Sequence, residues 1–89
     1  MAEEEIEVGF VEDYFAHVNV VALKITSDGI KVGDVLHFKG HTTDLVQEIS
    51  SMQIEHKSVK EAKVGASVGI KVTDRVRIHD KVFKVPVKE

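Results

Sequence analysis

The residues best suited to chemistry in this sequence are its histidines, hydroxyl side chains and carboxylates. Five histidines in 89 residues could in principle bind a metal ion: His17, His37, His41, His56 and His79. His37 and His41 are four residues apart, but Gly40 lies between them and the surrounding pattern is a strand running into a loop. Helical or ribbon spacing that would aim two imidazoles at one ion is therefore missing. We expect solvated or packed histidines and no metal site.

Nucleophilic catalysis needs a hydroxyl or thiol beside a base that a third group orients. Thr42, Thr43 and Asp44 follow His41, yet only proximity in sequence connects them, and capping or turn bonding explains them better. Glu12 and Asp13 are adjacent, so on a strand they point to opposite faces and cannot share acid–base work. The chain has no cysteine. We expect no catalytic residue, no cofactor and no enzymatic activity.

Arg75 and Arg77 are the basic pair of most interest, because alternate residues of a strand share one face. Lys71 or Lys81 could join them, and such a cluster can hold anionic groups. The alternative is a plain solvated strand face.

The net charge of −3 hides a division of the chain into an acidic and a basic part. Residues 1–56 carry eleven acidic and three basic side chains, whereas residues 57–88 carry three acidic and nine basic ones. The basic part could present one face to an anionic partner. Alternatively, a barrel interleaves distant strands, so that the two parts do not correspond to two faces.

Targeting and membrane signals are missing from the sequence. Residues 1–5 are an acidic tail without the apolar stretch of a signal peptide. No apolar run approaches the roughly 18 residues that a membrane span needs. The lack of cysteine fits a reducing compartment. We expect a cytoplasmic protein without membrane contact, with a single domain over residues 6–87.

Short apolar runs separated by turn residues indicate an all-β domain. The expected strands are residues 6–15 with a bend at Gly9, 18–25, 35–39 and 67–72, and a hairpin over 76–87. Residues 18–25 are apolar on both faces, which is typical of a doubly buried or bulged strand. Residues 42–54 have apolar positions at both helical and strand spacing, so periodicity alone leaves that segment open.

Two segments resemble the second domain of elongation factor Tu and related translational GTPases. Residues 30–40, Ile-Lys-Val-Gly-Asp-Val-Leu-His-Phe-Lys-Gly, are similar to its I-x-x-G-D-x-L-x-x-x-G segment. Residues 60–70 are similar to its A-x-x-G-x-x-V-G-I segment, and residues 8–11 to its opening G-x-V strand. The order and spacing of these motifs span residues 6–85. A similar barrel ends members of the collagenase-like peptidase family.

The resemblance implies a small closed antiparallel β-barrel of about six strands, as in a stand-alone translation elongation factor-like protein. It also implies a strand over residues 42–54 and a loop or short helical turn over 55–63. The residues expected to build its turns and strands are Gly29, Gly33, Asp34, Gly65 and Gly69. Gly33 permits a tight turn, Asp34 can accept a bond from a nearby N–H, and Gly69 allows close approach to its strand.

The phosphate-binding loop of the GTPases is absent from the sequence, so we expect no binding of nucleoside triphosphates. The resemblance favours a non-enzymatic module that contacts RNA, the ribosome or tRNA. The expected contact residues are Lys39, His41, Lys71, Arg75 and Arg77. The alternative is a protein–protein adaptor, a detached barrel that docks on an enzyme partner.

Overall fold

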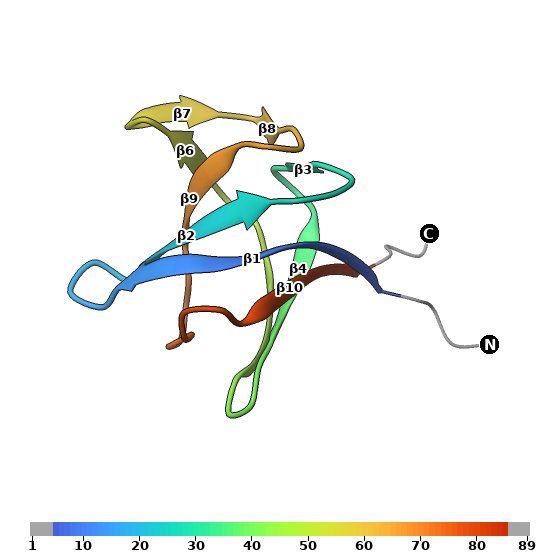
Figure 1. The fold of residues 1–89 in the computed structure, drawn as a ribbon. Helices are drawn as coiled ribbons and strands as arrows, with labels where there is room; N and C mark the ends of the chain where they lie inside the picture. Colours follow the sequence, from blue (N-terminus) through green and yellow to red (C-terminus); the bar gives the residue numbers. More distant parts are fainter. Residues whose placement is uncertain (1–4, 86–89) are drawn as a thin grey trace.

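The computed structural model describes residues 5–85, and every regular element within them is a β-strand (Figure 1). The strands in chain order are β1 (Ile6–Phe15), β2 (Val20–Ile25), β3 (Ile30–Lys31), β4 (Val35–Lys39), β5 (Asp44–Glu48), β6 (Met52–Ile54), β7 (Lys57–Val59), β8 (Glu61–Ala62), β9 (Ser67–Lys71) and β10 (Lys81–Val85). Residues 5–85 form no helix that could span a lipid bilayer. The predicted all-β class is confirmed. Of the predicted tail, only Glu5 is described, and residues 86–87 of the predicted domain lie outside the described part.

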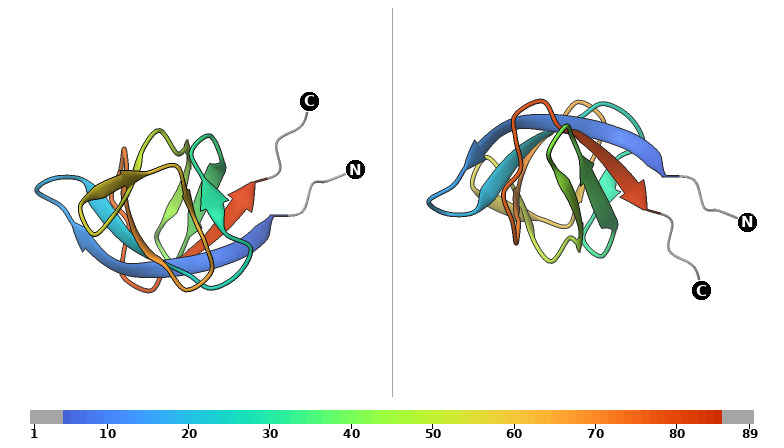
Figure 2. Two further views of the ribbon diagram at one scale, coloured as in Figure 1. Left: turned by 90° about the horizontal axis from the view of Figure 1, so that it is seen from above. Right: turned by 90° about the horizontal axis from the view of Figure 1, so that it is seen from below.

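Eight strands form one antiparallel sheet in the order β5-β4-β10-β1-β2-β9-β6-β7. The two short strands β3 and β8 pair separately. The large sheet curls around its own inner face (Figure 2). Its order nevertheless has two ends, β5 and β7, so the closed barrel of about six strands predicted from the sequence is not found.

A side chain crosses the gap that a further strand ladder would have closed. Gln47 on β5 donates from Nε2 to the Lys71 carbonyl at 2.9 Å, and its Oε1 accepts the Thr73 N–H at 2.8 Å. One amide thus connects the β5 edge to the end of β9. No main-chain ladder joins these two strands.

The core lies inside the curl and is built by alternation along the strands. Leu36 and Phe38 of β4 are fully buried, while His37 between them faces outward, as predicted. Val21, Leu23 and Ile25 of β2 are buried in the same way. The outward side chains of β2 remain half-buried, so, of the two predicted alternatives, burial of both faces is not found.

β1 is bent as predicted, because its pairing with β10 shifts register between Glu7 and Gly9. A second shift, against β2, falls between Val11 and Asp13. A Cβ atom at Gly9 would collide with the main-chain carbonyl of Lys24. Gly9 therefore allows two strands to approach at the bend.

Residues 42–63 differ from the sequence prediction in detail. The single strand expected over 42–54 is two strands, β5 and β6, separated at Ile49–Ser51. Ile49 is buried and exchanges main-chain bonds with the β3–β4 turn, accepting from Gly33 N and donating to the Asp34 carbonyl. Residues 55–63 were predicted as loop or helical turn, but they contain β7 and β8.

The predicted hairpin over residues 76–87 was also wrong in its first half, because residues 72–80 form a loop. At its end the loop exchanges main-chain bonds with Val11 of β1, and before that carboxylates bind its main chain. Asp74 accepts the Arg75 N–H at 2.7 Å, and the buried Asp80 accepts the Arg77 N–H at 2.9 Å. Such local bonds compete with a ladder. Within the loop, Val76 is buried and anchors it to the core.

Candidate functional site

The structure supplies no catalytic or metal constellation in the part of the chain that it describes. No group of three or more His, Cys, Asp or Glu side chains in residues 5–85 could hold a metal ion. His41 is exposed and Thr43 is buried. Across the same residues, no serine or threonine hydroxyl bonds to a histidine. The pair that the sequence placed side by side is therefore not arranged for nucleophilic attack.

Arg75 and Arg77 lie together, although on a loop and not on a strand. They line a hollow of about 400 Å³ with Asp74 and with Thr42 to Leu45 of the β4–β5 connection. Gly40 lets this connection lie against Asp80, because a Cβ atom at position 40 would collide with the Asp80 carboxylate. Among residues 5–85, no carboxylate forms an ion pair with either guanidinium.

The other predicted contact residues are dispersed. Lys39 lies over the ring of Phe83, with Nζ 5.9 Å from its centroid. His41 is exposed on the β4–β5 connection. Lys71 lines a different hollow, on the outer surface of β2 and β9. The structure thus brings Arg75, Arg77 and the His41 connection together but does not add Lys71 to them.

The predicted turn residues have the following conformations. Gly29, Gly33 and Gly65 have positive φ angles of 42°, 100° and 96°. The Asp34 side chain accepts the Lys31 N–H at 3.0 Å. Gly69 is different, because it lies in the interior of β9.

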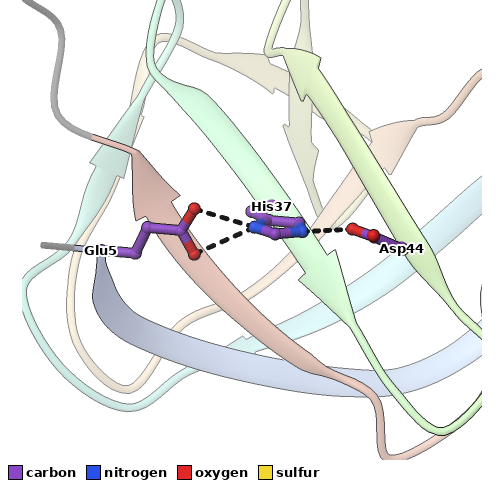
Figure 3. A network of polar contacts seen from close by, with 3 residues as sticks. All are labelled: Glu5, His37 and Asp44. Carbon is purple, nitrogen blue, oxygen red and sulfur yellow. Dashed lines mark hydrogen bonds and ion pairs between the residues drawn. The ribbon is translucent and has the colours of Figure 1, made fainter. Parts of the chain in front are cut away.

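His37 is bound on both sides by carboxylates (Figure 3). Its Nδ1 lies 2.9 Å from both Glu5 carboxylate oxygens, and its Nε2 lies 2.5 Å from Asp44 Oδ1. Burial lowers the pKa of His37, but the hydrogen bonds and negative charges of Asp44 and Glu5 outweigh it, so the pKa is raised. The cluster ties the segment before β1 to β4 and β5.

An apolar groove runs over the outer surface of β2, β9 and β6. Its volume is about 470 Å³, and its lining residues are Phe15, Val18, Val20, Ala22, Gln53, Glu55, His56, Ser67, Val68 and Gly69. A second hollow of about 270 Å³ shares Val18, Val20, Gln53 and Gly69 and adds Ser51 and Lys71. Phe15 is 41% exposed and Val18 is 46% exposed. We call the two hollows together the outer groove.

The sequence analysis missed both the His37 cluster and the outer groove. The signal for the groove was present, since residues 18–25 are apolar on both faces. We interpreted that pattern as a doubly buried or bulged strand. The structure leaves the outer half of it uncovered by residues 5–85.

Comparison with known proteins gives a consistent result. The chain is 40% identical over 80 residues to an uncharacterized protease of Methanocaldococcus jannaschii, covering 89% of this chain and 19% of the protease. It is 29% identical over 87 residues to a collagenase of Porphyromonas gingivalis, covering 97% of the chain and 21% of the collagenase. These relatives are peptidases, not translation factors. No protein-family model matches the chain.

A solved structure shows the same fold. The C-terminal domain of a Geobacillus thermoleovorans protein assigned to the U32 peptidases superposes with a TM-score of 0.82, at 18% sequence identity. The match covers 88% of this chain and 98% of that domain. The likeness to this domain shows the fold, and the chain spans about a fifth of the length of the curated relatives that it matches.

These findings correct the sequence analysis. The identification as a translation elongation factor-like protein was wrong, and so was the RNA-contacting function built on it. The alternative of a protein–protein adaptor agrees better with the relatives. Their proteolytic names also count against a flat prediction of no enzymatic role, although the matched region is a small part of them.

Proposed function

We propose that this chain is a non-catalytic docking domain that packs against the catalytic domain of a U32-type peptidase. The observation that carries the proposal is the extent of the similarity. It covers nearly all of this chain but only 19% of the Methanocaldococcus protease. The remainder of such a protein is large enough to hold the catalytic domain, and this fold would be its accessory domain.

The surface of the domain supports this role. Sheets in globular proteins bury their apolar faces against another layer. Here the inner face holds the core, while the outer groove leaves Phe15 and Val18 exposed. Contiguous exposed apolar surface marks an interaction site.

A chimera tests the proposal. This chain replaces the 80 matched residues of the Methanocaldococcus protease, and a second version of the protease lacks them altogether. Because a docked domain stabilises what it binds, the chimera should unfold in one cooperative transition at a higher temperature than the shortened protease. Calorimetry measures both transitions.

Independent melting would contradict the proposal. In that case the chimera would show two transitions, at the temperatures of the shortened protease and of this chain measured separately. Linking this chain to the shortened protease by a long flexible Gly/Ser segment is the control for mere covalent attachment.

A further inference from the structure

We infer that the outer groove receives an extended segment of the peptidase catalytic domain, with an aliphatic side chain of that segment seated over Gly69. This inference rests on the proposed function and specifies the surface that performs it. It also specifies the chemistry of the occupant.

Gly69 is the first ground for the inference. It lies in the interior of β9 and pairs with Ala22 on one side and Gln53 on the other. Glycine weakens a strand interior by roughly 0.5–1 kcal/mol relative to alanine. At Gly9 the fold requires glycine, but at Gly69 the nearest atoms to an added Cβ are 3.7 and 3.8 Å away, an ordinary contact. Nothing in residues 5–85 needs the missing side chain, so its space is available to a partner.

The walls of the groove are the second ground. Val20 and Ala22 of β2 point outward beside Gly69, and Phe15 at the end of β1 and Val18 of the β1–β2 connection extend beside them. All four are apolar, and Phe15 and Val18 are more than a third exposed. A groove with an aromatic and aliphatic wall and a glycine floor accepts an aliphatic side chain in preference to a polar one.

The two ends of the groove carry opposite charges. Because β6 runs antiparallel to β9, the β6–β7 turn with Glu55 lies at one end, while Ser51 and Lys71 lie at the other. Within the described residues, neither Glu55 nor Lys71 has an ion-pair partner. The matching segment has a basic residue at the Glu55 end, a central aliphatic residue and an acidic residue at the Lys71 end.

The β6–β7 turn adds a third ground. Glu55 and His56 have φ angles of 52° and 67°, in the left-handed region. Two-residue hairpin turns of this kind strongly prefer Asn-Gly. A less favourable pair that lines the groove at one end is consistent with selection for a contact, because strained backbone tends to lie at functional positions.

Cysteine footprinting tests the groove, since the chain has no cysteine of its own. Val18→Cys places a thiol in the groove wall, and Val46→Cys places one on the outer side of β5, where Val46 is 54% exposed. Each variant is labelled with a maleimide in the isolated chain and in the Methanocaldococcus chimera described above. Mass spectrometry follows the labelled peptide. We expect labelling of Val18→Cys to slow by about tenfold or more in the chimera. A tenfold change corresponds to a free energy of ~1.4 kcal/mol for the covered over the open groove. Val46→Cys should label at the same rate in both.

Gly69→Leu tests the floor of the groove. The added side chain fills it from a position with ordinary clearance, so the melting temperature of the isolated chain should not fall. In the chimera it should restore rapid labelling of Val18→Cys. Lys81→Leu, on the outer side of β10, is the matched control that adds a leucine elsewhere and should leave the protection intact.

The possible failures are distinguishable. Two separate melting transitions in the chimera would overturn the docking function itself. A single transition with full labelling of Val18→Cys would leave docking in place and overturn the groove as its surface. Protection in the isolated chain that grows with its concentration would assign the groove to a second copy and overturn the inference as well. Continued protection of Val18→Cys from labelling in a folded Gly69→Leu chimera would also overturn the inference.

Discussion

His37 has a carboxylate on each side of its ring, and a neutral imidazole has only one N–H to donate to them. Protonation provides the second donor, so the geometry favours imidazolium. The side chain is 13% exposed, whereas that of Asp44 is 82% exposed. The contact with Asp44 is therefore largely screened by water, and the cluster as a whole stabilises the fold only modestly.

Substituting His37 should give a stability loss that depends on pH. The pKa of His37 is raised above its ordinary value of 6.5 in the folded state. The stabilisation is thus fully present below the unfolded pKa and disappears as pH rises through the folded pKa. We expect His37→Gln to lower the free energy of unfolding by about 0.5–1 kcal/mol near pH 6, and by less at pH 9.

Urea unfolding of both proteins between pH 5.5 and 9 measures this difference. His41→Gln is the control, because His41 is exposed and forms no side-chain hydrogen bond within residues 5–85. A loss at His37 that is constant with pH would contradict the imidazolium assignment.

The partners of His37 also show what single residues can and cannot predict. Asp44 is seven positions away and Glu5 is 32 positions away. The register of β4 with β5 places Lys39 opposite Asp44, and only that register brings the carboxylate beside His37. Residue types alone predicted the absence of a local His–His site but not this long-range cluster.

At the scale of elements, the β6–β7 hairpin offers a stabilising change. Ile54 pairs with Lys57, so Glu55 and His56 form a two-residue turn, and both have positive φ. An L-residue in this conformation costs roughly 1–2 kcal/mol. Glu55→Asn combined with His56→Gly should therefore raise the free energy of unfolding by about 1 kcal/mol or more.

Chemical denaturation measures the gain. His17→Gly is the matched control, because the φ of His17 is not positive and glycine there should destabilise by about 0.5–1 kcal/mol. If the double change left stability unaltered or reduced, the turn would be relaxed in solution and the strain argument would not hold.

The elements were predictable where one face is buried and the other is wet. β4 and β9 alternate cleanly, and the sequence located both. The errors fall where short strands meet a bend or where side chains replace ladder bonds. Ile49 leaves the strand direction to bond with Gly33 and Asp34, and Asp74 and Asp80 bind the loop that precedes β10. Neither event has a periodic signature.

At the scale of the whole molecule, the order of the motifs predicted a closed antiparallel barrel, whereas the structure has a curled antiparallel sheet with two ends, and the motifs misidentified the family. The matched positions Gly33, Asp34 and Gly65 build turns, and turns of this kind serve unrelated functions on similar folds. The apolar outward side chains of β2 lie on an outer surface of the sheet. There the sequence pattern shows exposure without showing what covers it.

The curled shape of the sheet also depends on contacts between its distant strands. β5 is an edge strand, and Gln47 provides a side-chain link from it to the end of β9, through the Lys71 carbonyl and the Thr73 N–H. Gln47→Leu removes both bonds and leaves the two main-chain groups without that partner. We expect a loss of about 1–3 kcal/mol in the free energy of unfolding, accompanied by faster amide exchange in β5 than in β1 or β2.

Hydrogen exchange followed by NMR separates this local opening from global destabilisation. Gln47→Glu is the informative comparison, because it keeps the acceptor for Thr73 but loses the donor to Lys71. It should therefore fall between the wild type and Gln47→Leu. An open β5 edge would also expose unpaired main-chain groups, so Gln47→Leu should self-associate at lower concentration in light scattering. Uniformly faster exchange over all strands would instead show that the sheet opens as one unit and that Gln47 does not hold its edge.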